Sequence, residues 1–77
     1  MREQILNLIE RHSQQQGFAM DVPLVQLGID SMKLIQVILD IETELGLIAP
    51  DQYMTEEWFR SPETVVRLFE EVARLKE

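Results

Sequence analysis

The stretch LGIDSMKLIQVILDIETELG, residues 27–46, decides the fold because it joins a loop to the longest amphipathic helix of the chain. At 100° per residue, the predicted helix over residues 31–45 has one apolar face and one polar face, and Gly46 ends it. The apolar face is formed by Leu34, Ile35, Ile38, Ile41 and Leu45, and the polar face by Lys33, Gln36, Asp40, Thr43 and Glu44. A helix with a single apolar face has to be covered by other elements.

Two further helices are predicted, one on each side of this stretch. The first covers residues 2–14 and ends in residues 14–17, where Gly17 suits a C-terminal cap. The last begins at Ser61-Pro62-Glu63, which places a capping serine, a proline and an acid in the preferred order. It runs to about Leu75. The residues expected to face inward are Ile5, Leu6, Leu8 and Ile9 in the first helix, and Val65, Val66, Leu68, Phe69, Val72 and Leu75 in the last.

The two connections complete the predicted architecture. Residues 18–28 form a loop whose apolar side chains are expected to fold back over the core, namely Phe18, Val22, Leu24 and Leu27. Residues 47–54 form a second loop, and residues 55–59 form a short helical turn capped by Thr55. We find no strand-like alternation and no repeat. The sequence therefore predicts an all-α fold, a small four-helix bundle of three main helices and one short one, in a single domain over residues 1–77.

Composition restricts the chemistry that the chain can perform. It has 77 residues and no cysteine, so it has no thiolate metal site and no thiol nucleophile, and a thiol would have to come from a cofactor. The net charge is −7, and residues 40–57 hold six acids and no base. Such a surface would repel nucleic acid and attract basic protein partners, or it simply keeps the protein soluble. With no apolar run of transmembrane length and no signal peptide, we expect a cytoplasmic protein without a membrane span.

Ser31 is the main candidate for a functional residue. Its hydroxyl is predicted to be exposed at the start of the helix, between Asp30 and the apolar Met32. One interpretation is a helix cap, since serine and aspartate are both favoured there. No histidine or cysteine lies nearby in sequence, and His12 has no acid placed to orient it, so a catalytic triad is not supported. We expect no catalytic residue and no metal site, and interpret Ser31 as a site of modification.

Residues around Ser31 suggest a surface for protein partners. Met32, Ile35 and Leu39 form an edge that is either ordinary core or an exposed apolar strip. Met54 and Trp58 are candidates for the same rim, with core the favoured place for Trp58. Acids near the C-terminal end of this helix interact unfavourably with its dipole. They suggest either a surface kept for a partner or random variation of surface residues in an acidic protein. The expected partner-binding residues are Met32, Ile35, Leu39, Asp40, Glu44 and Met54. Glu42 falls near the apolar side without an evident role.

These features resemble the phosphopantetheine-attachment region of acyl and peptidyl carrier proteins. The resemblance lies in residues 27–32, followed by Leu34-Ile35 and by residues 42–47, and it extends over essentially the whole chain. Met32 replaces the leucine usual in the family's Asp-Ser-Leu triplet. The resemblance implies that Ser31, preceded by Asp30 of the triplet, receives a 4'-phosphopantetheine arm from coenzyme A. The thiol of the arm would then carry an acyl or aminoacyl thioester, and the protein itself would not be an enzyme.

The resemblance also implies partners: a phosphopantetheinyl transferase, an adenylating or acyltransferase loading enzyme, and a downstream synthase or transferase. A freestanding monomer is expected. Fatty-acid carriers bear acids in the first turns of this helix, where Lys33 and Gln36 stand here, so we favour specialised-metabolite biosynthesis of the polyketide or nonribosomal peptide type. Residues 54–62 resemble D-alanyl carriers for cell-envelope polymers, which is the alternative within the family. Outside it, the alternatives are an unmodified helical interaction module and, less favoured, a small hydrolase using Ser31.

Overall fold

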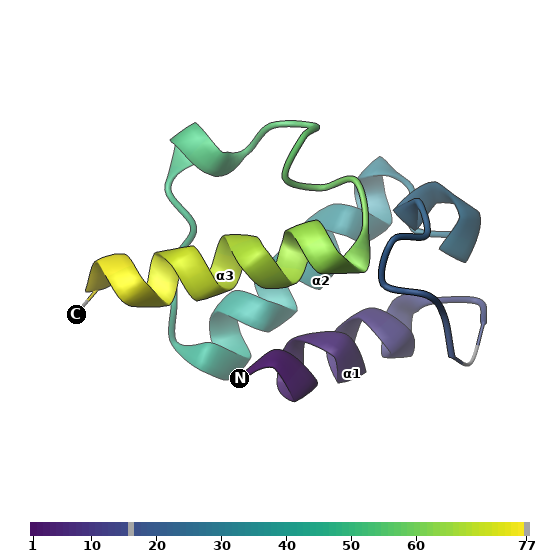
Figure 1. The fold of residues 1–77 in the computed structure, drawn as a ribbon, viewed down its shortest axis with the longest axis horizontal. Coiled ribbons are helices and arrows are strands. Elements are labelled where there is room, and N and C mark those ends of the chain that lie inside the picture. Colours follow the sequence, from purple (N-terminus) through teal and green to yellow (C-terminus); the bar gives the residue numbers. More distant parts are fainter. Residues whose placement is uncertain (16, 77) are drawn as a thin grey trace.

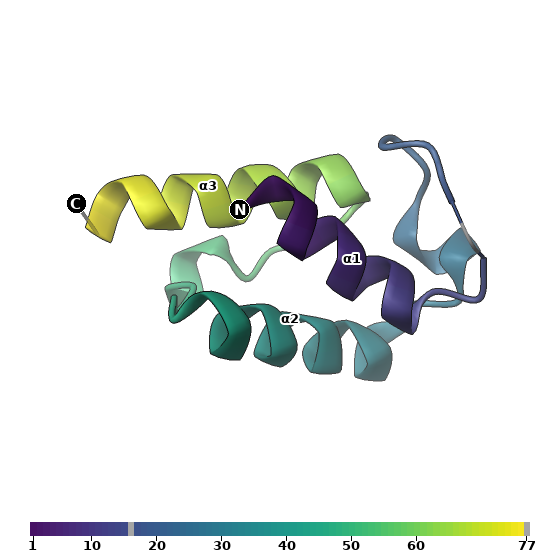
Figure 2. The same ribbon diagram turned by 90° about the horizontal axis from the view of Figure 1, so that it is seen from below.

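The protein folds into three α-helices joined by loops that contain two short 3₁₀ helices. A computed structural model describes residues 1–15 and 17–76. In chain order the elements are α1 (Arg2–His12), η1 (Leu24–Leu27), α2 (Ser31–Leu45), η2 (Asp51–Tyr53) and α3 (Pro62–Lys76). Figure 1 shows α1 on one side of α3 and the connection between α2 and α3 on the other side, and Figure 2 shows α2 facing α1 and α3. The predicted all-α fold with three main helices is confirmed.

The core lies between the three helices, because α1 packs against both α2 and α3. Its fully buried side chains include Ile5, Ile9, Ile41, Val65, Val66, Leu68 and Phe69. The loop before α2 contributes to this core as predicted, since Leu24 and Leu27 of η1 are buried and Phe18 and Val22 pack partly against it. The loop therefore closes one end of the core and leads directly into Ser31.

The buried face of α2 is rotated from the face that the sequence predicts. Ile35, which the sequence places on the apolar face and also on the edge that is either core or an exposed strip, is 59% exposed, whereas Val37 is 1% exposed. The two residues lie on opposite flanks of the apolar face formed by Leu34, Ile38 and Ile41. His12 of α1 pairs with Asp40 on the flank of α2 that carries Val37. Helix α1 therefore packs against this flank, and the flank that carries Ile35 is left uncovered.

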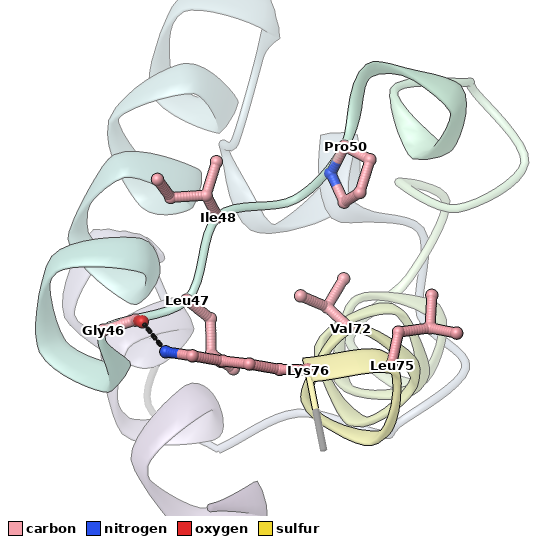
Figure 3. Close-up of a pocket in the computed structure, with 7 residues that line it drawn as sticks. All are labelled: Gly46, Leu47, Ile48, Pro50, Val72, Leu75 and Lys76. Atoms are coloured by element: carbon pink, nitrogen blue, oxygen red, sulfur yellow. Dashed lines mark hydrogen bonds between the residues drawn. The ribbon is translucent and has the colours of Figure 1, made fainter.

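The last turn of α3 also departs from the prediction, because Leu75 is 57% exposed rather than buried. It lies on the rim of an apolar groove of about 350 Å³, together with Val72, Ile48 and Pro50. Figure 3 shows the groove between the end of α3 and the chain that leaves α2. Leu75 faces this shallow groove instead of another helix, so its burial is incomplete.

The predicted short helix over residues 55–59 is a pair of turns, which corrects the sequence prediction. The amides of Trp58 and Phe59 donate to the carbonyls of Thr55 and Glu56, respectively. Thr55 accepts the first of these hydrogen bonds through its backbone carbonyl, and its side chain does not act as the predicted cap. The short helical element is instead η2, four residues earlier. A segment of five residues gains too few hydrogen bonds to offset helix nucleation, and Trp58 is held by an edge-to-face contact with Tyr53, whose ring centroid is 5.5 Å away.

Helix α1 ends earlier than predicted, whereas α3 begins where the sequence predicts. Helix α1 ends at His12 with Ser13 as its C-cap, earlier than predicted, because the Gln14 amide donates to the carbonyl of Leu27 at 2.9 Å instead of continuing the helix. Gly17 is therefore not the cap, and Gln16 lies outside the described residues. The predicted start of α3 is confirmed, since the Ser61 amide donates to Thr64 Oγ1 at 3.0 Å and Thr64 Oγ1 donates to the Ser61 carbonyl at 2.9 Å.

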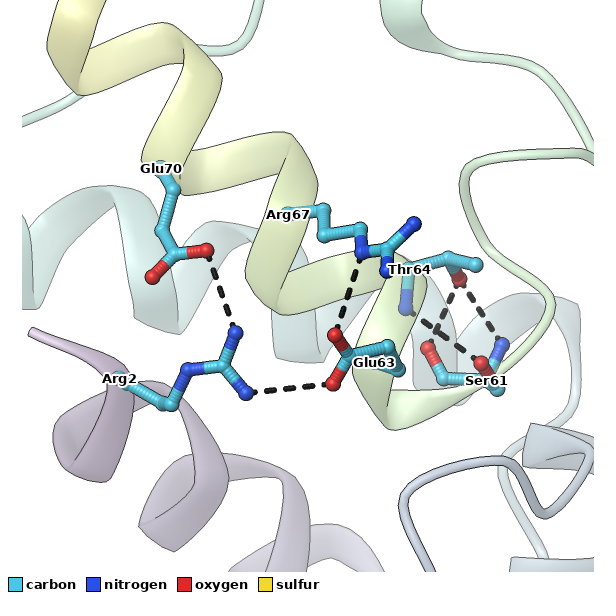
Figure 4. A network of polar contacts seen from close by, with 6 residues as sticks. All are labelled: Arg2, Ser61, Glu63, Thr64, Arg67 and Glu70. Atoms are coloured by element: carbon cyan, nitrogen blue, oxygen red, sulfur yellow. Dashed lines mark hydrogen bonds and ion pairs between the residues drawn. The ribbon is translucent and has the colours of Figure 1, made fainter.

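A network of charged side chains fixes α1 to the start of α3. Arg2 Nη1 lies 3.2 Å from Glu63 Oε2, and Arg2 Nη2 lies 3.3 Å from Glu70 Oε1. Arg67 Nε donates to the other oxygen of Glu63 at 3.2 Å. Figure 4 shows Glu63 between the two guanidinium groups. The hydrogen bond from Arg2 and its positive charge, with a smaller contribution from Arg67, hold the pKa of Glu63 below its ordinary value of 4.5.

This lowered pKa predicts a pH-dependent contribution to stability. The charged carboxylate of Glu63 stabilises the fold above its ordinary pKa of 4.5, and this contribution is lost as the pH falls through the lower pKa of the folded state. In urea titrations we expect Glu63→Gln to have a lower unfolding midpoint than the native protein at pH 7 and the same midpoint once Glu63 is fully protonated. A difference in midpoint that stays constant down to pH 2 would contradict this account.

Candidate functional site

Asp30 caps α2 and thereby fixes the start of the helix. Its backbone is extended, and its Oδ1 accepts a hydrogen bond from the amide of Lys33 at 2.9 Å. Its carbonyl accepts from the Leu34 amide at 2.8 Å. Both are the bonds of an N-cap residue. The interpretation of Ser31 as the cap is therefore wrong: Asp30 fills that position, and Ser31 is the first residue of the helix.

Ser31 is left with a free hydroxyl. The residue is exposed, and within residues 1–15 and 17–76 its Oγ makes no hydrogen bond. The two other serines of the chain are engaged. Ser13 Oγ bonds to the amide and the carbonyl of Gln15, and Ser61 is buried in the cap of α3, where its Oγ accepts from the Thr64 amide. Ser31 is thus the serine whose hydroxyl is both exposed and available for reaction.

The turn before Ser31 is held by backbone hydrogen bonds and by burial, and one glycine is required in it. Gly28 has a φ of +80°, and a Cβ at this position would lie 2.6 Å from the side chain of Gln14. Its amide donates to carbonyls of η1. Ile29, the next residue, is buried. The chain is therefore held on both sides of Asp30, so the position of Ser31 is set by the core and not by a flexible loop.

Beside Ser31 lies an exposed apolar strip, which we define as Met32, Ile35 and Leu39. These side chains are 77%, 59% and 55% exposed, respectively. Of the two interpretations that the sequence allows, the structure supports the exposed strip over ordinary core. Met54 is also exposed, whereas Trp58 is half-buried and packs against the core, as the sequence favoured. Exposed apolar residues grouped in this way are typical of a protein-binding surface.

Two of the three acids near the end of α2 have partners that the sequence did not reveal. Asp40 Oδ2 lies 2.6 Å from Nε2 of His12 on α1, so the statement that no acid is placed to orient His12 is wrong. Glu42 Oε2 accepts a hydrogen bond from the Ala49 amide at 2.9 Å and so fastens the chain that follows α2. Glu44 is exposed.

A cation also faces the end of α2. Lys76 Nζ donates to the carbonyl of Gly46 at 3.0 Å, as Figure 3 shows. A positive charge at this place interacts favourably with the negative end of the helix dipole. Lys76 of α3 therefore offsets part of the unfavourable interaction between the dipole of α2 and the acids near its end.

Ser31 opens onto a groove of about 510 Å³, which we call the Ser31 groove. It is lined by Pro23, Leu24, Val25, Ile29, Asp30, Ser31, Leu34, Glu56, Phe59 and Arg60. The Arg60 carbonyl accepts from the Leu24 amide at 3.0 Å, which holds the end of the α2–α3 connection against η1. Sequence reasoning missed Arg60 and Glu56, because no local pattern relates them to a serine 25 or more residues earlier.

The described residues contain no group of three or more histidines and acids placed to hold a metal ion. None of the helices within residues 1–15 and 17–76 combines the length and the apolar character needed to cross a bilayer.

Comparison with known proteins decides the family. Residues 3–69 match the family model described as "Phosphopantetheine attachment site". The chain belongs to the phosphopantetheine-dependent carrier proteins. Carrier proteins of this family are not catalysts, and they bear a covalently attached 4'-phosphopantetheine. An exposed, unbonded hydroxyl beside an open groove fits the attachment of such an arm.

Two curated relatives of this carrier protein come from Bradyrhizobium diazoefficiens. Aminoacyl carrier protein 1 is 32% identical over 72 residues, which cover 88% of this chain and 80% of the relative. Aminoacyl carrier protein 2 is 31% identical over 72 residues and has 81% of its length covered.

Two solved structures have the same fold. One is a chain in the crystal structure of Bradyrhizobium japonicum glycine:[carrier protein] ligase complexed with glycylated carrier protein. It has a TM-score of 0.77 and 26% identity, over 87% of this carrier and 95% of that chain. The other is from the complex of the ligase with its cognate carrier protein and an analogue of glycyl adenylate. It has a TM-score of 0.72 and 24% identity, over 91% of each chain, and supports the fold alone.

Proposed function

We propose that Ser31 is the attachment residue and that the protein carries an aminoacyl group as a thioester on its phosphopantetheine arm. The observation that carries this proposal is the free hydroxyl of Ser31 at the first residue of α2, where Asp30 already serves as the cap. The hydroxyl of Ser31 would displace 3',5'-adenosine bisphosphate from coenzyme A and form a phosphodiester. The proton of the hydroxyl would pass to a base of the transferase, because His12 is paired with Asp40, which lies nine residues after Ser31 on α2 and so roughly 13 Å further along the helix.

An amino acid is the cargo that the relatives favour. Two relatives are named aminoacyl carrier proteins, and a solved neighbour is a glycylated carrier bound to its glycine ligase. By analogy, an adenylating ligase would activate an amino acid, and the thiol of the arm would displace AMP to form the thioester. Coenzyme A and ATP are both needed, so we assign this work to the cytoplasm. Lys33 and Gln36 are exposed on α2, which supports a specialised pathway over fatty-acid synthesis.

The partners would bind beside the arm. The apolar strip supplies a small apolar centre, and Met54, Asp40 and Glu44 add to its rim, where acids would attract basic partners and speed their association. The transferase, the loading ligase and a downstream enzyme would use this surface in turn. Tethering keeps the cargo at a high effective concentration for each of them, and the protein would work as a monomer formed by one domain.

The proposal predicts two successive mass increases. The purified protein is first incubated with coenzyme A and a promiscuous phosphopantetheinyl transferase, and we expect one phosphopantetheine to be added. An amino-acid:[carrier protein] ligase is then tested with glycine, D-alanine and other amino acids. We expect one aminoacyl group to be added and to be released by hydroxylamine, because thioesters are cleaved by this nucleophile. Intact-protein mass spectrometry reads both steps.

Ser31→Ala is the matched control and should show neither increase while keeping the helical circular dichroism of the native protein. Transfer of the arm followed by loading of acyl groups but no amino acid would contradict the aminoacyl cargo. Loading of D-alanine in preference to all others would assign the protein to the D-alanyl carriers. No transfer by several transferases, on a sample shown by mass to be unmodified, would leave only an unmodified interaction module.

A further inference from the structure

We propose that the arm on Ser31 docks in the Ser31 groove, with its phosphodiester paired to the guanidinium of Arg60. This inference rests on the proposed modification of Ser31 and adds a binding site for the arm on the carrier itself. The groove opens at Ser31 and has a volume of about 510 Å³. Sites for small molecules generally have about 300–1,000 Å³, so the groove is large enough to hold a bound group of this kind.

The chemistry of the groove follows the order of groups along the arm. One methylene beyond the phosphodiester, the arm has a carbon that bears two methyl groups, and a hydroxyl, two amides and the thiol come after it. The groove offers a cation at Arg60 and an apolar wall that includes Val25, Ile29 and Phe59. Val25 is 72% exposed, and covering it would remove apolar area from water. The methyl groups would therefore lie on this wall while the phosphodiester stays at the opening.

The backbone of Arg60 is held in place while its side chain is free to bind. Its carbonyl accepts from the Leu24 amide at 3.0 Å, and its amide donates to Thr64 Oγ1 at 3.2 Å. Within the described residues its guanidinium makes no ion pair. Guanidinium groups bind phosphate oxygens through two parallel hydrogen bonds. A substitution of the side chain leaves both backbone bonds in place, so the role of the guanidinium can be tested separately from the fold.

Three other charged residues near Ser31 could affect the binding of the phosphodiester. Asp30 lines the groove, but its Oδ1 accepts from the Lys33 amide. Glu56 also lines the groove and would repel the phosphodiester. Lys33 is exposed on α2 and is not part of the groove. We therefore expect substitutions of Arg60 and Glu56 to change docking in opposite directions and a substitution of Lys33 to leave it unchanged.

The experiment uses the intact chain after transfer of the arm, with the added mass verified first. Nuclear Overhauser effects are recorded between the methyl protons of an unlabelled arm and the ¹³C-labelled methyl groups of the protein. We expect contacts with Val25 and Ile29 and none with Met32 or Leu39. Arg60→Gln should lower the ratio of docked to free arm about two- to fivefold, the range given by exposed ion pairs. Glu56→Gln should raise this ratio, and Lys33→Gln, the matched loss of a cation, should leave it unchanged.

The outcomes distinguish this inference from the proposed function. If the mass does not increase, the modification of Ser31 fails. If the mass increases but the arm shows no contact with Val25 and Ile29, only the docking site is refuted. A loss of docking in Lys33→Gln that equals the loss in Arg60→Gln would also refute it, because the effect would then be one of net charge. Arg60→Lys keeps the charge but loses the paired hydrogen bonds of the guanidinium, so it should dock more weakly than the native protein and more strongly than Arg60→Gln. If Arg60→Gln does not fold, the contacts of the native arm with Val25 and Ile29 still decide whether the docking site exists.

Discussion

Phe69→Ala is expected to destabilise the carrier by about 3–5 kcal/mol, the usual cost of removing a buried phenyl ring. Phe69 is completely buried in α3, and its removal would leave a cavity between the three helices. Proteins of this size have a total stability of roughly 0.05–0.15 kcal/mol per residue, so this loss is comparable to the whole. We expect urea unfolding followed by circular dichroism to show a partly or wholly unfolded variant at 25 °C.

Leu75→Ala is the control for this experiment. Leu75 lies on the same helix, but it is 57% exposed at the rim of a shallow groove. We expect its substitution to lower stability by less than about 1 kcal/mol, because little apolar area is removed from the interior. Equal destabilisation by Leu75→Ala and Phe69→Ala would contradict the exposed position of Leu75 at the end of α3.

Ile35→Asn is expected to slow phosphopantetheine transfer by about thirtyfold or more in kcat/KM. The proposed partner surface places Ile35 at the centre of the apolar strip, between Met32 and Leu39. The substitution removes apolar area from the interface and introduces an amide without a hydrogen-bond partner, which together cost about 2 kcal/mol or more. The net charge of the chain is unchanged. Transfer is measured by intact mass at several protein concentrations below saturation.

Ile48→Asn is the matched control. Ile48 is 80% exposed, and it lies after the end of α2, away from Ser31, beside the apolar groove of Figure 3. The chemical change is identical, but the residue lies outside the apolar strip. We expect transfer at close to the native rate. Equal losses for Ile35→Asn and Ile48→Asn, with both variants folded by circular dichroism, would contradict the location of the partner surface.

The sequence predicts what depends on local pattern. The stop at Gly46 and the start at Ser61-Pro62 follow from local propensities, and the structure confirms both. Ser31 could be singled out for the same reason, because an acid and a serine precede a long amphipathic helix. The sequence has two adjacent residues that could cap the helix and does not decide between them. The structure shows that Asp30 is the cap.

The sequence does not predict what depends on how the helices are placed. Periodicity gives the width of the apolar face of α2, but the position of α1 decides that Val37 is buried and Ile35 exposed. The pairing of His12 with Asp40 joins residues 28 positions apart. The Ser31 groove likewise combines η1, the start of α2 and the end of the α2–α3 connection, so Arg60 has no local signal that relates it to Ser31.

The attachment of the arm to Ser31 is the central claim, and tandem mass spectrometry of the modified protein tests it most directly. After transfer from coenzyme A, the protein is digested and the peptide that carries the arm is fragmented. The account predicts the entire added mass on Ser31 and none on Ser13 or Ser61, whose hydroxyls are engaged in hydrogen bonds. An arm found on any other residue, or an arm still added to Ser31→Ala, would contradict the account.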